Sequence, residues 1–481
     1  MTGTKLLPGQ ASLPTPNSTK SFWHSQPSKI LLGHRTTEAL PTEADLVIVG
    51  SGLSGTSAAH FVREDEVGKA MKVVMLEARE ACWGATGRNG GHCQPFIYGN
   101  PPAVGAFEMR NYQHIKSFIA THNIPCDWRT LSVAHAYMDS TMFQHSLSIF
   151  QDLLEQDPSM SDLVSVITPQ STNPSLAELR IPTAAGAFLQ KHAASVWPYK
   201  LVSWMLERLL DGNEKDNPNF NLQTNTAVTH LQKAPDGSWI VHTSRGMIAT
   251  KKVLLTTNAY TSHLLPSFSD LIVPVRGEMS SLIPPSTMKP GSEENPPLEY
   301  SYGFIGNGRQ NRHQDDYLIQ RPYSKDKDSS SAGGGELMFG GGRSYAANAG
   351  LGVSDDSSID LPAAEYLRKE ITVIVDIKSE EKKLKATYEW SGIMGYSRDD
   401  RPWVGEVTEE LGLGGGEGLF VCAGFTGHGM PNTCLSGKAA VELILGRKSE
   451  EVDLPESYRL SRERVVKARM LDEVHIVDAK G

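Results

Sequence analysis

Two short apolar runs near the start of the chain alternate with a stretch of helical spacing. Asp45–Gly50 (DLVIVG) and Lys72–Glu77 (KVVMLE) are rich in β-branched and aliphatic residues, as is typical of fully buried parallel strands. Between them, Ser54–Arg63 places small and apolar residues at helical spacing. Residues 45–77 are therefore predicted to form one strand–helix–strand unit of an α/β fold.

The remaining pattern predicts further elements in both parts of the chain. Helices are expected over 104–122, 141–156, 184–211 and 432–446. Strands are expected over Asn221–Leu231, Trp239–Thr243, Val253–Thr257 and Leu419–Cys422. The stretch up to Thr42 contains Pro8, Pro14, Pro16 and Pro27 and is predicted to be an extended arm. Polar, Pro-, Ser- or Gly-rich segments at 284–297 and 324–335 are predicted to be surface loops.

Composition limits the classes of protein to which the chain can belong. With 481 residues, 39% of them hydrophobic, the chain is long enough for two domains with real cores. A net charge of −9 without a basic stripe argues against a nucleic-acid partner. No apolar run reaches the roughly 18 residues of a membrane helix. No signal-peptide core is visible, so a cytoplasmic enzyme is expected. Five cysteines without a CxxC spacing support neither a disulfide framework nor a metal site.

A glycine-rich motif follows the first predicted strand. Gly50-Ser51-Gly52-Leu53-Ser54-Gly55 fits G-x-G-x-x-G and opens a helix, which is the context that dinucleotide binding requires. Its glycines allow a tight turn, close approach of a pyrophosphate, and helix–strand packing. Glu77 ends the second strand, where a carboxylate binds ribose hydroxyls and disfavours a 2′-phosphate. The alternative is a glycine-rich turn in an unrelated α/β unit, and the motif alone does not separate NAD from FAD.

A second glycine-rich loop, Gly84–His92 (GATGRNGGH), lies just beyond the second strand. Its many backbone N–H groups suit a ribityl–pyrophosphate chain and a flat ring lying close to the backbone. The alternative is a mobile surface loop. Together with the first motif, this loop favours FAD over NAD.

Three segments carry a resemblance to a known family. Glu77-Ala78-Arg79, the GRNGG of the second loop, and Gly424–Gly429 (GFTGHG) are similar to the D-amino-acid oxidase superfamily. The resemblance is closer to its sarcosine, glycine and γ-glutamylputrescine oxidase branch. Weaker matches in the family's order extend it over about residues 45–446; they are TTNAY at 256–260, PVRGE at 274–278, FGGG at 339–342, and WSG at 390–392 before PWVG at 402–405.

The resemblance implies an α/β protein with a Rossmann-type FAD-binding domain and an interleaved α+β substrate domain built on an antiparallel sheet. Residues 1–39 would form the N-terminal arm. The FAD-binding domain would come from 40–105, 184–275 and 388–481, and the substrate domain from 106–183 and 276–387.

The resemblance also implies how FAD is held. Val228 would lie on the adenine, Ala259 near the pyrophosphate, and the turn Gly427–Met430 at the N1/C2=O edge of the flavin. Non-covalent FAD is expected, because no cysteine lies in 392–395 and Arg88 stands where some relatives have an attaching histidine. His92 is the alternative attachment point. The predicted cofactor contacts are Gly50, Gly52, Leu53, Ser54, Gly55, Glu77, Ala78, Arg79, Thr86, Gly87, Arg88, Asn89, Gly90, Gly91, His92, Val228, Asn258, Ala259, Gly427, His428, Gly429 and Met430.

The function implied by the resemblance is FAD-dependent oxidation of a C–N bond in a small amine or amino acid. A hydride passes to flavin N5, the product imine hydrolyses, and O2 is the expected acceptor. Flavin chemistry of this kind needs mainly placement, so the sequence compels no acid–base pair. Two alternatives remain open at this point: a biosynthetic flavoenzyme with a larger alkaloid-like substrate, and a flavin-binding protein without turnover. The sequence predicts no oligomeric state.

Four residues are the catalytic candidates, each with a structural alternative. His428 would contact substrate or O2, or else order its own turn. Arg276 would bind a substrate carboxylate, or else serve only the fold. Tyr302 and Tyr317 would form aromatic walls of an amine pocket, or else be ordinary residues of the sheet.

Overall fold

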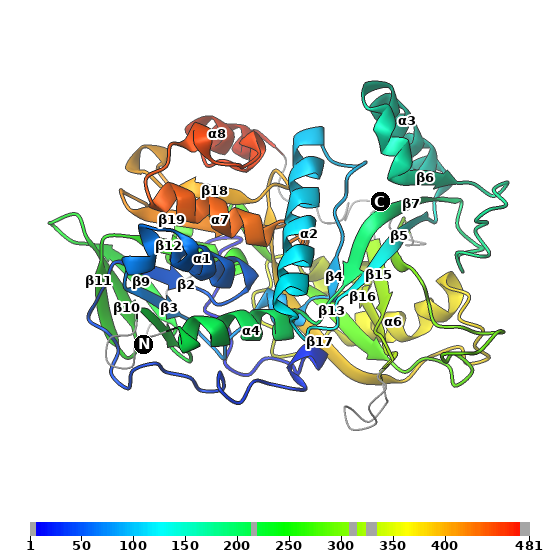
Figure 1. The fold of residues 1–481 in the computed structure, drawn as a ribbon, viewed down its shortest axis with the longest axis horizontal. Coiled ribbons are helices and arrows are strands. Elements are labelled where there is room, and N and C mark those ends of the chain that lie inside the picture. The colour runs from blue at the N-terminus through cyan, green and yellow to red at the C-terminus, as the bar shows by residue number, and fades with distance from the viewer. Residues whose placement is uncertain (1–5, 213–218, 307–314, 324–333, 472–481) are drawn as a thin grey trace.

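The computed structural model describes residues 6–212, 219–306, 315–323 and 334–471. Two sheet systems lie side by side, and the long helix α2 (Pro102–His122) stands between them (Figure 1). The predicted α/β fold with a Rossmann-type part and a second sheet is confirmed.

The first system contains the predicted strand–helix–strand unit. A six-stranded sheet has the order β18 (Trp403–Glu406), β19 (Leu419–Ala423), β12 (Val253–Leu255), β2 (Leu46–Val49), β3 (Val73–Leu76) and β8 (Phe220–Gln223). All its neighbouring pairs are parallel except β18–β19. A four-stranded sheet beside it has the order β1 (Glu43–Ala44), β11 (Gly246–Thr250), β10 (Trp239–Thr243) and β9 (Val228–Lys233).

Both faces of the six-stranded sheet are covered, which explains its continuous apolar strands. Leu46 and Ile48 of β2 pack in the core that contains the helices, whereas Val47 and Val49 pack toward the four-stranded sheet. The helices on the first face are α1 (Leu53–Glu64), α4 (Pro198–Asp211) and α7 (Thr433–Ile444).

The second system is one large sheet. Its path is β17 (Ala386–Ser397), β13 (Ile272–Leu282), β16 (Leu337–Gly341), β15 (Asp315–Gln320), β14 (Ser301–Ile305), β5 (Arg129–Tyr137), β7 (Gly186–Ser195) and β4 (His92–Cys93), with β6 (Val164–Ile167) paired to β7. Among the described strands of this large sheet, only β5 and β14 pair in parallel. Four further α-helices complete the described fold: α3 (Ser140–Gln156), the short α5 (Thr261–Leu264), α6 (Leu361–Ile374) and α8 (Arg462–Met470).

Two predicted elements were wrong in kind or extent. The helix expected over 184–211 is strand β7 followed by α4, because β7 completes the ladder between β4, β5 and β6. Tertiary pairing overrides local propensity there. The single strand expected over Asn221–Leu231 is split into β8 and β9, and Asn225 adopts a left-handed φ of 51° between them. The predicted loop at 324–335 lies mostly outside the described residues.

The chain passes between the first sheet system and the large sheet more often than the domain boundaries predicted from the sequence imply. Strands β4, β7 and β17 come from segments assigned to the FAD-binding part, yet all three belong to the large sheet. The N-terminal arm is also more integrated than an extended tail: Ala11, Phe22, Trp23 and Leu31 are all buried. Figure 1 shows it in dark blue, running along the lower side of the first sheet system as far as α4 and β17.

Gly55 provides a sharp test of the helix–strand packing at the first motif. A Cβ at Gly55 would lie 2.1 Å from the carbonyl oxygen of Gly50, whereas one at Gly84 would meet nothing within 4 Å. Overpacking of this kind costs about 1–3 kcal/mol or more, so Gly55→Ala is expected to lower the free energy of unfolding by about 3 kcal/mol. Gly84→Ala is the matched control and should stay close to wild type in urea denaturation. Equal stability of the two variants would contradict the packing described here.

Candidate active site

A cavity of about 520 Å³ runs between the nucleotide-binding motifs and the large sheet. Its walls include the first Gly-rich turn, the end of β3, the second Gly-rich loop and the C-terminal turn. On the other side they include residues of β5, β13, β14, β15 and β17. One continuous space therefore connects the elements predicted for a dinucleotide with those predicted for a substrate.

The first Gly-rich turn presents the start of helix α1 to this cavity. Gly50 has a φ of 109°, and a Cβ there would lie 2.8 Å from the carbonyl oxygen of Thr256. The Leu53 N–H donates to Thr86 Oγ1 at 3.1 Å, which fixes the second loop against the helix start. A helix N-terminus carries partial positive charge, so this wall suits a pyrophosphate.

Glu77 lines the cavity at the end of β3, and its carboxylate is held in place. Its Oε2 accepts from the backbone N–H of Ser51 at 3.0 Å and from Ser51 Oγ at 2.7 Å, and its Oε1 accepts from the Arg79 N–H at 3.0 Å. A carboxylate has about four acceptor sites, so three such bonds leave room for a ribose hydroxyl.

The C-terminal turn is fixed by a side-chain amide. The N–H groups of Gly424 and Phe425 donate to Asn258 Oδ1 at 3.0 and 3.3 Å. Gly427 has a φ of 70° and opens the part of the turn that lines the cavity. Asn258 thereby ties the end of β12 to the turn after β19.

His428 lies in this turn and pairs with a buried acid. Its Nε2 is 3.1 Å from Glu108 Oε2 on α2, and Glu108 is only 1% exposed. Burial would lower the pKa of His428, but the charge and hydrogen bond of Glu108 outweigh burial and raise it above 6.5. Burial would raise the pKa of Glu108, but His428 and bonds from Phe96 and Asn432 lower it. The pair is therefore an ion pair over a window that extends above pH 6.5.

The far end of the cavity is formed by the large sheet. Arg343 lies with its guanidinium carbon 5.3 Å from the ring centre of Tyr396 and donates to the hydroxyl of that tyrosine. The rings of Tyr317 and His92 lie nearly perpendicular to each other, with centres 5.2 Å apart. Burial lowers the pKa of His135 to about 3, so this ring, bonded through Nδ1 to the Tyr98 hydroxyl, is neutral at physiological pH. This end therefore brings the Arg343 guanidinium together with aromatic rings, a neutral histidine and the carboxyl groups of Glu278 and Asp316.

Most predicted cofactor residues line the cavity, and three glycines lie behind its wall. Those in the lining are Gly50, Gly52, Leu53, Ser54, Glu77, Ala78, Arg79, Thr86, Arg88, Asn89, Gly90, His92, Val228, Asn258, Ala259, Gly427, His428, Gly429 and Met430. Gly55, Gly87 and Gly91 instead allow close packing. A Cβ on Gly87 would lie 2.1 Å from the Cys82 carbonyl oxygen, and one on Gly91 2.7 Å from the Trp23 ring.

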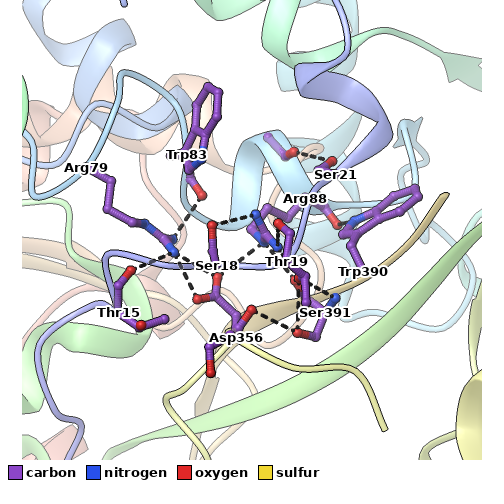
Figure 2. Close-up of polar contacts among 12 residues, drawn as sticks. Thr15, Ser18, Thr19, Ser21, Arg79, Trp83, Arg88, Asp356, Trp390 and Ser391 are labelled. Carbon is purple, nitrogen blue, oxygen red and sulfur yellow. Dashed lines mark hydrogen bonds and ion pairs between the residues drawn. The ribbon is translucent and has the colours of Figure 1, made fainter. Parts of the chain in front are cut away.

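The charged ends of two predicted cofactor residues are engaged elsewhere (Figure 2). Arg79 donates through Nη1 to Asp356 Oδ1 at 2.9 Å and through Nη2 to the Trp83 carbonyl at 2.9 Å. Arg88 donates through Nε to the Ser391 carbonyl at 2.7 Å and lies 3.2 Å from Asp356 Oδ2. Burial lowers the pKa of Arg88 to about 10, so it stays charged at neutral pH.

Two of the four catalytic candidates do not line the cavity. Arg276 points its guanidinium toward Glu278, at 3.6 Å, and Asp360, at 3.8 Å, so it is not placed to bind a substrate carboxylate. Tyr302 is fully buried and stacks on Phe304, and only Phe304 of this pair lines the cavity. His428 and Tyr317 do line the cavity.

Several lining or supporting residues carried little signal in the sequence. Arg343 directly follows the FGGG segment, and that adjacency was the one available clue. Glu108 lies within an amphipathic helix and His135 within a strand, where single polar residues are common. Glu278 lines the cavity, and burial raises the pKa of its carboxyl to about 8.

Other site types find little support in the described ranges. No group of three or more His, Cys, Asp and Glu side chains there could hold a metal ion. The five cysteines, all within those ranges, are buried thiols. No described helix has both the length and the apolarity to cross a bilayer.

Comparison with known proteins agrees with this geometry. The family described as "DAO: FAD dependent oxidoreductase" matches residues 45–443, so the chain belongs to that family and is an FAD-dependent oxidoreductase. It is 24% identical over 435 residues to the "Probable oxidoreductase OrdL" of Rhizobium meliloti (strain 1021), covering 86% of this chain and 85% of that one. It is 22% identical to the "Gamma-glutamylputrescine oxidoreductase" of Escherichia coli (strain K12), covering 84% of each.

Solved structures share the fold at low sequence identity. An L-amino acid deaminase from Proteus vulgaris, solved without its insertion sequence, aligns with a TM-score of 0.64 at 18% identity, over 92% of this chain and 100% of that one. The glycine oxidase from Geobacillus kaustophilus aligns with a TM-score of 0.61 at 16% identity, over 85% and 96%.

The ion pair of His428 with Glu108 predicts the direction in which the pKa of His428 changes when Glu108 is replaced. In wild type, Glu108 raises the pKa of His428 above 6.5. In Glu108→Gln the raising charge is lost, and burial together with the charge of Arg401 lowers the pKa of His428. Protonation of His428 therefore stabilises the fold. This contribution is fully present below pH 6.5 and is lost as the pH rises through the raised pKa of His428. Because His428 lines the cavity, its titration should change the slope of the flavin midpoint potential plotted against pH. The pH of this slope change should be lower in Glu108→Gln than in wild type.

The control for this experiment is Asn100→Ala. Asn100 also donates to Glu108, at 3.1 Å, but its loss leaves the carboxylate in place, so the slope change should stay near that of wild type. The assignment fails if Glu108→Gln leaves the slope change unmoved, or if the change persists in His428→Asn.

Proposed function

We propose that this FAD-dependent oxidoreductase oxidises the C–N bond of a small amine or amino acid, with O2 as the electron acceptor. The observation that carries the proposal is the single cavity that extends from the nucleotide elements to Arg343, Tyr396 and Tyr317. A substrate at that far end would share one continuous cavity with the cofactor. The names of the γ-glutamylputrescine oxidoreductase and the glycine oxidase support the same substrate class.

The residues of the cavity fit FAD and can place such a substrate. FAD, when bound, supplies the two-electron acceptor for the hydride that leaves the carbon next to nitrogen. Loss of that hydride and of the nitrogen proton leaves a C=N bond, which water hydrolyses to a carbonyl compound. The chain's own task is orientation, which accounts for a large share of rate enhancement in reactions of this kind.

Arg343 is proposed to orient the substrate through a carboxylate. A guanidinium presents several donors in one plane and matches a carboxylate with two parallel hydrogen bonds. The Tyr396 ring beneath it keeps that plane fixed, at 5.3 Å. Tyr317 forms an aromatic wall, and neutral His135 adds no charge that would repel an ammonium group.

The most direct test of the reaction is a substrate panel. Purified protein is expected to be yellow, and its flavin should bleach anaerobically with at least one amine or amino acid. Air should then restore the colour and form peroxide. If dithionite bleaches the flavin but no member of a broad panel does, the proposed function is wrong.

The role of Arg343 is tested by Arg343→Gln. Charge-assisted hydrogen bonds are worth about 1.5–3 kcal/mol, so KM for a carboxylate-bearing amine should rise roughly 10- to 100-fold. KM for an analogue without the carboxylate should change little. Arg276→Gln should leave the preference between the two substrates unchanged, since its guanidinium faces Glu278 and Asp360. If Arg276→Gln instead of Arg343→Gln selectively raised KM for the carboxylate-bearing amine, Arg276 would be the carboxylate-binding residue.

A further inference from the structure

The N-terminal arm contributes directly to the wall of the cofactor cavity. Residues 9–24, here named the strap, pass across the cavity where β3 ends. Leu13 and Pro14 line the cavity there, together with Glu77 and Arg79. Tyr260 and His263 belong to the same lining. This end of the cavity is the one predicted to hold the ribose and adenine of FAD.

The strap is anchored before it reaches the cavity. The Ala11 N–H donates to Ser262 Oγ at 2.9 Å, and the Ser12 N–H donates to Ser354 Oγ at 3.1 Å. Gly9 has a φ of 74° and packs so tightly that a Cβ there would lie 2.3 Å from the Ser269 carbonyl oxygen.

The strap is anchored again after it leaves the cavity. The Thr19 N–H donates to the Asp356 carbonyl at 2.7 Å, and Arg88 Nη2 donates to the Thr19 carbonyl at 2.6 Å. The Trp23 indole donates to the Asn89 carbonyl at 2.5 Å, and the Trp23 side chain is 1% exposed. Leu13 and Pro14 therefore span the gap between two fixed points.

A buried ion cluster holds the second anchor (Figure 2). The carboxylate of Asp356 has no solvent exposure and is 2.9 Å from Arg79 Nη1 and 3.2 Å from Arg88 Nε. Both guanidinium groups also use strap atoms as acceptors, since Arg79 Nη1 reaches the Thr15 carbonyl at 3.4 Å. Buried charges are costly when they lose a partner. The cluster therefore favours the docked strap, and lifting the strap would leave buried donors unpaired.

We propose that the strap is a retaining wall of the FAD site, with Asp356 as the positioning residue that keeps it docked. FAD enters and leaves only when the strap lifts. The cofactor is thereby retained by a segment distant in sequence from the Gly-rich motifs. This inference rests on FAD binding alone and does not depend on the amine substrate.

The test measures exchange of FAD rather than turnover. Holoprotein loaded with radiolabelled FAD is chased with excess unlabelled FAD, and the dissociation rate is followed by filtration. A chain that starts with Met followed by Ser18 lacks Leu13, Pro14 and Thr15 but keeps Thr19 and Trp23. Loss of the wall should raise the FAD dissociation rate at least about tenfold, because the strap then no longer gates release. Asp356→Asn should give a smaller increase in the same direction.

The matched control is Asn17→Ala. Asn17 is an exposed strap residue whose side chain is not part of either anchor, so its FAD dissociation rate should match wild type. If the truncated chain does not fold, as judged by circular dichroism, the full-length double variant Leu13→Gly/Pro14→Gly decides. A dissociation rate equal to that of Asn17→Ala in this double variant would overturn the proposal.

Amide hydrogen exchange provides an independent readout of the docked strap. Excess FAD should slow exchange of the Ala11, Ser12 and Thr19 amides, because the proposal requires the strap to lift whenever FAD is released. Exchange of these amides at an equal rate in apo- and holoprotein would also overturn the proposal.

Discussion

The ion cluster of Asp356 with Arg79 and Arg88 is the constraint on which the cofactor side of the molecule depends. A fully buried carboxylate is stable only when it is paired, and removal of one partner from such a cluster typically costs about 3–5 kcal/mol. The two arginines belong to the end of β3 and to the second Gly-rich loop, and Arg88 also binds Ser391 of β17. The Asp356 carboxylate therefore fixes its own segment against the end of β3 and the second Gly-rich loop, and Arg88 extends this contact to β17.

The position of the cavity follows from the topology of the parallel sheet. Ligands of open α/β sheets bind beyond the carboxyl ends of the strands. Gly50 follows β2, Glu77 follows β3, Asn258 follows β12 and Gly427 follows β19, and all four line one cavity. The large sheet closes the other side and brings Arg343 and Tyr317 within the same space. The fold thus brings a cofactor site and a candidate substrate site into contact, although their residues come from separate segments of the chain.

The sequence predicted the parts of the structure that depend on local pattern. The unit from β2 to β3 was readable because buried parallel strands and a Gly-rich helix start have strong local signatures. Strand β7 was not, because its strand identity comes from pairing with β5 rather than from its own residues. Arg79 and Arg88 line the cavity, but their guanidinium groups bind a carboxylate 277 and 268 positions away in the chain, which no local pattern reveals. The same limit applies to Arg276 and Arg343, which both lie next to a glycine in the sequence; only the tertiary structure shows that Arg343 lines the cavity whereas Arg276 faces Glu278 and Asp360.

The central proposal is that the cavity shared by cofactor and substrate serves to break a C–H bond next to nitrogen. The most direct measurement is the anaerobic rate of flavin reduction by a substrate amine, compared with the same amine deuterated at that carbon. The account predicts that deuteration slows flavin reduction several-fold, because the hydride leaves that carbon in the step observed. Equal reduction rates for the two isotopologues under single-turnover conditions would contradict it.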